Sequence, residues 1–193
     1  MPAPNPGPPV WLLDIDGVIN ALGMSLPTDT WPESAWVQRV VTAVIPEQGM
    51  GTYPILAARP VLDFIHRVHR NGLAEIRWHS TWRSAAVTGL APALGLPAIP
   101  ISVAPEWSAA PPVWWKIPAA RRVAESGRRL LWTDDQFDLY RADPQSASEL
   151  EALERWTGAL LLSANPETGL SPDDLATIER FLEPGRGGCR SSG

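Results

Sequence analysis

The chain contains a single cysteine and a single lysine, and it has no long apolar run. Cys189 has no second cysteine within the chain, which excludes an internal disulfide and a cysteine-based metal cluster. No stretch reaches the roughly 18 consecutive apolar residues of a membrane-spanning helix, and prolines stand at the N-terminus where a signal peptide would be apolar. We therefore expect a cytoplasmic protein with no membrane partner.

The composition otherwise predicts one globular domain. The 193 residues are 45% hydrophobic, enough for one buried core, and the net charge of −5 gives no overall attraction to nucleic acid. Residues 1–9 and 185–193 are rich in Pro, Gly or Ser and lack apolar periodicity, so we predict disordered tails there. The folded domain is predicted at residues 10–184.

Short apolar runs alternate with helical patterns along this domain. Strands are predicted at 10–13, 74–80, 97–103, 128–135 and 159–165, and helices at 60–72, 82–95, 115–127, 146–158 and 171–182. This alternation predicts an α/β fold, a Rossmann-like parallel five-stranded sheet with helices on both faces. Within residues 21–59, strand patterns at 36–44 and 52–58 predict a small β-hairpin flap, or minimal cap. The last helix has the clearest start signal, with Ser171 as N-cap and Asp174 placed for a capping box.

Polar side chains follow three of the predicted strands. They are Asp14 and Asp16 after the first strand, Ser80 and Thr81 after the second, and Asp134 and Asp135 after the fourth. Burying a carboxylate without a partner costs several kcal/mol, so acids at the end of a buried strand imply a metal, a ligand or an open site. Because ligands bind beyond the carboxyl ends of parallel strands, we expect these side chains to converge on one site.

The single lysine adds a second signal. Of the 16 basic residues, 15 are arginine, and Lys116 opens the helix before the fourth strand. A site that needs a compact ammonium group rather than a wide guanidinium fork would explain this exception.

In order along the chain, these residues resemble the motifs of the haloacid dehalogenase (HAD) superfamily of phosphotransferases. The matching segments are "DIDGV", the end of "IRWHST", Lys116 and "WTDD". More narrowly, "LLDIDGVIN", "WHSTW", "WWKIPA", "LLWTDDQ" and "NPETGLSPDDLATIERFL" are similar to the small HAD domains that occur alone or within bacterial Swiss-Army-knife RNA repair proteins. The resemblance implies the sheet order fifth, fourth, first, second, third strand.

The resemblance also implies roles for the catalytic residues. Asp14 would be the nucleophile that forms an aspartyl-phosphate. Asp16 would protonate the leaving oxygen and then activate the hydrolytic water. Ser80 would donate a hydrogen bond to phosphate, and Lys116 would neutralise both Asp14 and the developing charge.

A Mg²⁺ ion is the cofactor that these oxygen ligands imply. It would be held by a carboxylate oxygen of Asp14, the backbone carbonyl of Asp16 and one acid of the pair Asp134 and Asp135. We favour Asp135 for the metal and Asp134 for orienting a metal-bound water or Lys116.

Substrate contacts are predicted around the second motif. Ser80 and Thr81 are adjacent, so one of them can fill that motif. We prefer Ser80 because it falls two residues after Trp78 in a "W-x-S/T" pattern that resembles the family's. Thr81 is the alternative, and we assign it, with Arg83 and Gly17, to substrate binding. Arg83 lies just beyond the second strand.

The sequence therefore predicts a Mg²⁺-dependent phosphatase that hydrolyses phosphomonoesters. Its phosphorylated substrate is either a small molecule or a nucleic-acid end, and the short flap favours an open site. Two alternatives stay open: a catalytically idle binding or regulatory module on the same fold, and a metal-dependent nucleotide-sugar transferase that uses "DID" as an Asp-x-Asp motif. The transferase leaves Lys116 and "WTDD" without an explanation.

Overall fold

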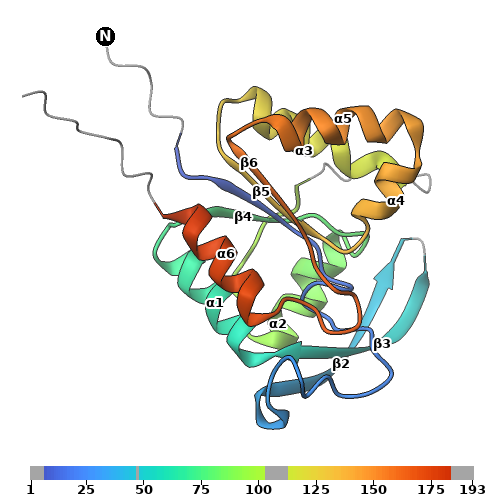
Figure 1. Cartoon of the computed structure of the whole chain (residues 1–193). Helices are drawn as coiled ribbons and strands as arrows, with labels where there is room; N and C mark the ends of the chain where they lie inside the picture. Colours follow the sequence, from blue (N-terminus) through green and yellow to red (C-terminus); the bar gives the residue numbers. More distant parts are fainter. Residues whose placement is uncertain (1–6, 47, 103–112, 184–193) are drawn as a thin grey trace, which may run out of the picture.

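The computed structural model describes residues 7–46, 48–102 and 113–183 (Figure 1). The predicted tail at 185–193 lies outside these residues, and the predicted tail at 1–9 is described from Gly7 onward. In that short stretch the Pro8 carbonyl accepts a hydrogen bond from the Arg128 side chain at 2.7 Å. The Pro9 carbonyl accepts one from the Glu75 backbone at 2.8 Å. The chain is therefore tied to the sheet just before the first strand begins.

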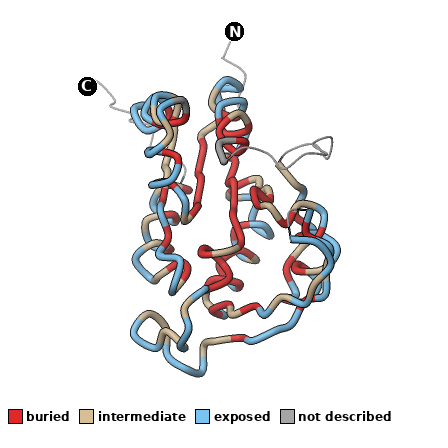
Figure 2. Tube along the Cα trace, turned by 90° about the vertical axis from the view of Figure 1, so that its right-hand side faces the viewer, coloured by how far each residue is buried: buried red, intermediate tan, exposed pale blue. Residues whose placement is uncertain are grey.

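Four parallel strands form the central sheet in the order β4-β1-β5-β6. They are β1 (Val10–Leu13), β4 (Glu75–Trp78), β5 (Leu130–Asp134) and β6 (Ala159–Ser163). All of β1 and β5 is buried, as expected of parallel strands that are covered on both faces (Figure 2). The predicted α/β class is confirmed, and the four strands follow the predicted order with β1 in the interior of the sheet.

The prediction of a strand at 97–103 is wrong for the residues that the structure describes there. Residue 103 lies outside the described residues, and the remainder makes one parallel bridge, between Ile101 and Trp78 at the β4 edge. Pro97 and Pro100 have no N–H to donate to a ladder, which explains why pairing here does not extend into a strand. The bridge stands where the predicted order places the third strand, so its position is right and its length is wrong.

Helices cover both faces of the sheet, as predicted (Figure 1). On one face Trp11 and Leu13 pack in a core with residues of α1 (Arg59–Arg70) and α6 (Pro172–Leu182). On the other, Val10 and Leu12 pack with residues of three helices: α3 (Ile117–Glu125), α4 (Phe137–Ala142) and α5 (Pro144–Arg155). Helix α4 was not predicted. Among the described residues no helix is long and apolar enough to cross a bilayer.

Helix α6 begins where the sequence predicts, with Ser171 as its N-cap. Ser171 Oγ accepts a hydrogen bond from the Asp174 backbone, and the Asp174 carboxylate accepts one from the Ser171 backbone at 2.8 Å. This reciprocal capping box satisfies two N–H groups that a helix leaves without partners, and Pro172 begins the helix where a missing N–H costs nothing.

The predicted hairpin is present and longer than expected. Strands β2 (Trp36–Ile45) and β3 (Gly49–Ala58) pair in antiparallel fashion through their full lengths. The hairpin contacts the chain that follows β4: the Tyr53 ring lies edge-on to the Trp82 ring, with 5.3 Å between centroids. The insertion between β1 and α1 is therefore braced against the end of β4.

The helix predicted at 82–95 is interrupted. A π-helical turn at Ala86–Leu90 precedes the short α2 (Ala91–Leu94). Pro92 has no N–H for a bond to the preceding turn, which accounts for the change of hydrogen-bonding pattern just before it.

Candidate functional site

Asp14 lies at the carboxyl end of β1, between the ends of β4 and β5. Its backbone N–H donates to the Thr133 carbonyl at 3.2 Å, which fixes it to β5 beyond the last paired residue of β1. The residue is 4% exposed, and Oδ1 accepts a hydrogen bond from the Ile15 backbone at 2.7 Å. The backbone therefore holds the carboxylate in one orientation.

Lys116 joins two acids in the interior. Its Nζ donates to Oδ2 of Asp14 and, at 2.7 Å, to Oδ2 of Asp134. The side chain is 3% exposed, and the residue is the N-cap of α3, which directs it toward the strand ends. Burial opposes the ammonium charge, but the two carboxylates raise the pKa of Lys116 well above its ordinary value. The lysine is therefore a fixed positive charge.

Asp134 accepts hydrogen bonds on both of its carboxylate oxygens. Its Oδ1 accepts from the Gln136 backbone at 2.9 Å, while Oδ2 accepts from the Trp132 indole at 3.1 Å and from Lys116. The residue is completely buried. These partners match the preferred assignment, in which Asp134 orients Lys116.

Asp135 has a different environment. Its Oδ1 is buried, and no described residue forms a hydrogen bond with it. Burial raises the pKa of Asp135 to about 6, and the neighbouring Asp134 adds to the rise. A buried carboxylate oxygen without a partner is costly, so this atom is the clearest indication of a cation site.

A carboxylate oxygen from each of Asp14, Asp134 and Asp135 lies within 4.8 Å of the others. Burial raises the pKa of Asp14 to about 7; Lys116 opposes the rise and Asp134 adds to it. Three acids share one ammonium group, so the cluster carries excess negative charge that a hard divalent cation would balance. The oxygen donors fit such an ion.

Gly17 lies directly against Asp135. It has a φ of +70°, and a Cβ at this position would be 2.4 Å from Oδ2 of Asp135. The glycine, predicted as a substrate contact, thus leaves the space that the Asp135 side chain occupies.

The Asp16 side chain is held apart from the three-acid cluster. Its Oδ1 accepts from Asn20 Nδ2 at 2.9 Å and its Oδ2 from the Trp82 indole at 2.8 Å. Asp16 is half-buried. Both carboxylate oxygens are thus hydrogen-bonded, and the role of the backbone carbonyl as a metal ligand stays a prediction.

The other predicted residues follow β4. Ser80 is buried, and its carbonyl accepts a hydrogen bond from the Arg83 backbone at 3.2 Å. Thr81 and Arg83 are half-buried. Arg83 adopts a left-handed φ of 46°, which an arginine takes up at a cost, so the chain turns sharply after Ser80.

His79 links this turn to Lys116. Its Nε2 lies 3.1 Å from the Lys116 carbonyl and its Nδ1 lies 2.6 Å from Ser102 Oγ. Burial and the charge of Lys116 hold the pKa of His79 well below its ordinary value, so the ring is neutral. With Nε2 protonated, the ring donates to the carbonyl and accepts from the serine.

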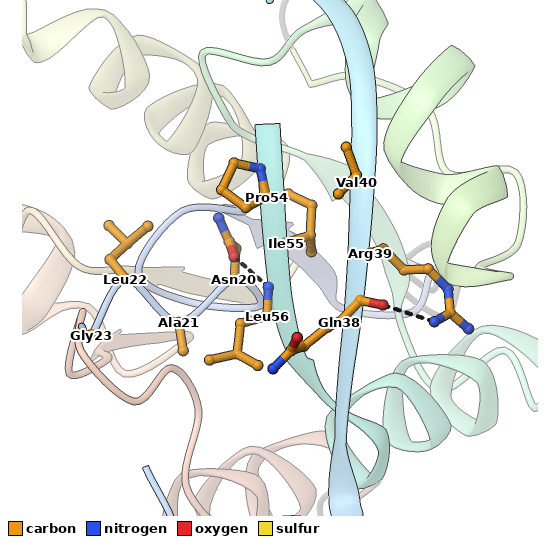
Figure 3. Close-up of a pocket in the computed structure, with 10 residues that line it drawn as sticks. All are labelled: Asn20, Ala21, Leu22, Gly23, Gln38, Arg39, Val40, Pro54, Ile55 and Leu56. Carbon is orange, nitrogen blue, oxygen red and sulfur yellow. Dashed lines mark hydrogen bonds between the residues drawn. The ribbon is translucent and has the colours of Figure 1, made fainter. Parts of the chain in front are cut away.

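A cavity of about 600 Å³ lies beside Asn20, the residue whose side chain donates a hydrogen bond to Asp16 (Figure 3). Asn20 lines it, together with the next three residues and facing residues of β2 and β3. Most of its walls are apolar, among them Leu22, Val40 and Pro54. It can accept a group larger than phosphate beside the residue that contacts Asp16.

Sequence reasoning did not find Asn20 and left the roles of Trp82 and His79 open. Asn20 is four residues after Asp16, so their contact is local and the spacing was available as a signal. The direction of the Trp82 indole depends on the turn after β4, which no spacing reveals. Comparisons of the chain with protein-family models, with curated proteins and with solved structures found no match.

Proposed function

We propose that this protein is a Mg²⁺-dependent phosphatase of the HAD type that hydrolyses phosphomonoesters through an aspartyl-phosphate on Asp14. The observation that carries the proposal is the buried Lys116, which bridges Asp14 and Asp134 at the carboxyl ends of the parallel strands. A fixed ammonium beside a carboxylate at this edge suits the transfer of an anionic group.

Asp14 is the nucleophile in this proposal. A hydrogen bond from the Ile15 backbone to Oδ1 and the ion pair with Lys116 fix the carboxylate, so attack on phosphorus needs little reorganisation. Lys116 offsets negative charge on the phosphoryl oxygens as the bond to the leaving oxygen breaks. Ser80, buried at the end of β4, donates a hydrogen bond to the phosphoryl group.

Asp14, Asp135 and the Asp16 carbonyl would hold the Mg²⁺ ion. When bound, the ion neutralises the phosphate and lets the carboxylate nucleophile approach it. The unpartnered Oδ1 of Asp135 and the excess acid of the cluster support this ligand set.

Asp16 moves the proton. It protonates the leaving oxygen while Asp14 attacks, and it then accepts a proton from the water that hydrolyses the aspartyl-phosphate. Its half-buried position supports this role, because a proton-transfer group must be reachable by the leaving oxygen and by water.

A phosphorylated nucleic-acid end is the substrate class we favour. The insertion between β1 and α1 is a two-stranded hairpin, too small for a separate cap domain. A site without a cap domain on this side would admit the end of a polymer as well as a small phosphoester.

The experiment is a phosphate-release screen in Mg²⁺ with 3'- and 5'-phosphorylated oligonucleotides, nucleotides, sugar phosphates and an aryl phosphate. We expect turnover that Asp14→Asn abolishes. Release of no phosphate from any of them would favour the idle binding module, and glycosyl transfer from a nucleotide sugar would favour the transferase.

A further inference from the structure

Both oxygens of the Asp16 carboxylate are engaged by side-chain donors. Asn20 Nδ2 lies 2.9 Å from Oδ1, and the Trp82 indole nitrogen lies 2.8 Å from Oδ2. Each carboxylate oxygen can accept two hydrogen bonds, so both keep acceptor capacity for a substrate or a proton. The two donors act from different parts of the chain and together define the plane of the carboxylate.

Both donors are in turn supported by strand β3 of the hairpin. Asn20 Oδ1 accepts a hydrogen bond from the Leu56 backbone at 2.9 Å, which Figure 3 shows as a dashed line. The adjacent residue, Ala21, donates its backbone N–H to the Leu56 carbonyl, also at 2.9 Å. The Trp82 ring is 1% exposed and lies against the Tyr53 ring. The hairpin therefore contacts Asp16 through two independent intermediates.

We propose that Trp82 and Asn20 are positioning residues for Asp16, and that the hairpin orients the proton-transfer group of the site through them. This assignment rests on the proposed phosphatase function. An acid must lie within hydrogen-bonding reach of the leaving oxygen, and an aspartate held by two donors does not have to be ordered when the substrate binds.

The step that depends on this positioning is the first phosphoryl transfer. Asp14 forms a bond to phosphorus, the bond from phosphorus to the leaving oxygen breaks, and the proton of Asp16 passes to that oxygen. In the second step water forms a bond to phosphorus, the bond to Asp14 breaks, and Asp16 takes the proton of the water. Removing one donor leaves the acid free to rotate away from the leaving oxygen.

The effect of Asp16 positioning on the cleavage rate depends on the leaving group. A nitrophenolate departs without a proton, whereas an alkoxide, such as the ribose oxygen of a nucleotide, needs one. Loss of positioning should therefore impair the cleavage of alkyl phosphates and largely spare aryl phosphates.

The test compares kcat/KM for 4-nitrophenyl phosphate and a phosphorylated oligonucleotide in Trp82→Phe and Asn20→Ala. We expect each variant to lose on the order of thirtyfold with the oligonucleotide, below the full contribution of a general acid, and about twofold or less with the aryl phosphate. Two variants are used because the Trp82 ring is buried and one replacement can fail to fold.

Two controls separate positioning from a general structural effect. Trp36→Phe removes another indole hydrogen bond of the hairpin, to the Trp31 carbonyl at 3.1 Å, and should leave both substrates unaffected. In an Asp16→Asn background the Trp82→Phe change should have no further effect on the oligonucleotide, because the group it positions is gone.

Equal losses with both substrates, or an undiminished Trp82→Phe effect in the Asp16→Asn background, would overturn the positioning role while Asp14-dependent turnover still supports the phosphatase. If the wild-type protein hydrolyses neither of these substrates nor any other phosphoester of the screen above, the phosphatase is overturned, and this assignment with it.

Discussion

Lys116 and Asp134 form an ion pair in the interior of the protein, with Nζ 2.7 Å from Oδ2 and almost no exposure of either side chain. Such a pair is costly to desolvate, so its geometry matters more than its net charge. The ammonium also contacts Asp14, so one compact charge bridges the two acids.

Replacement of Lys116 by arginine keeps the charge and changes the shape. The planar guanidinium must displace a neighbour in a buried space, so we expect Lys116→Arg to fold but to lose about a hundredfold in turnover, on the order of 3 kcal/mol. Steady-state kinetics measure the loss. The reverse exchange on exposed Arg121 of α3, Arg121→Lys, serves as a control and should leave turnover unchanged. Turnover close to wild type in Lys116→Arg would show that its shape is irrelevant.

Gly17 gives a prediction with a matched control. Gly17→Ala strains a φ of +70° and pushes a Cβ into the Asp135 carboxylate, whereas Gly72→Ala strains a φ of +60° with nothing within 4 Å. Gly72→Ala should lower the free energy of unfolding by roughly 1 kcal/mol, as an alanine in the left-handed region does, and Gly17→Ala should lower it further because of the overlap with Asp135. Only Gly17→Ala should also raise the Mg²⁺ concentration needed for activity. The same metal requirement in both variants would contradict the role of Asp135.

Metal dependence tests the oxygen cluster directly. We expect EDTA to abolish activity and Mg²⁺ to restore it, because the acids fit a hard cation. Asp135→Asn should weaken Mg²⁺ binding at least tenfold, as loss of a charged ligand does, while Asp63→Asn, on the exposed side of α1, should not. Calorimetric titration of the protein with Mg²⁺ measures this apart from turnover. Full activity after exhaustive chelation would show that catalysis does not require a metal ion.

The pH dependence of Mg²⁺ binding follows from the buried acids. Burial raises the pKa of Asp135 to about 6 and that of Asp14 to about 7, so both acids retain protons in slightly acidic solution. Protons and Mg²⁺ compete for the same oxygens, and binding must release them. Mg²⁺ affinity should therefore rise as the pH rises through 6 and 7 and level off above, with the steepness reduced in Asp135→Asn. A Mg²⁺ affinity that does not change with pH would contradict this prediction, because Asp14 and Asp135 would then be ionised over the whole range.

The sheet and much of the site were predictable because their signals are local or obey general rules. A continuous apolar run predicted β1, and the rule that parallel strands end at one edge predicted that Asp14 and Asp134 would meet. The scarcity of lysine singled out Lys116, and helix-capping chemistry located the start of α6. None of these depends on how particular side chains pack.

The remaining features depend on tertiary packing or on competing local effects. Two prolines shortened the strand predicted at 97–103, although its apolar pattern is strand-like. The short α4 has too few residues to show a helical period. The Trp82 contact to Asp16 requires the turn at Arg83 and the rotamer of a buried indole, and neither can be derived from residue spacing. Orientation of side chains was thus the main quantity that the sequence concealed.

The central claim is that Asp14 carries the phosphoryl group, and acid-quenched mass spectrometry tests it most directly. Asp16→Asn, mixed with 4-nitrophenyl phosphate and Mg²⁺, should still transfer the phosphoryl group, because that leaving group needs no proton, but should hydrolyse the intermediate slowly. We predict phosphate on the peptide that contains residue 14, and none when Asp14 is also replaced by asparagine. Rapid release of nitrophenol by Asp16→Asn with no phosphorylated peptide, or phosphate on another residue, would contradict the account.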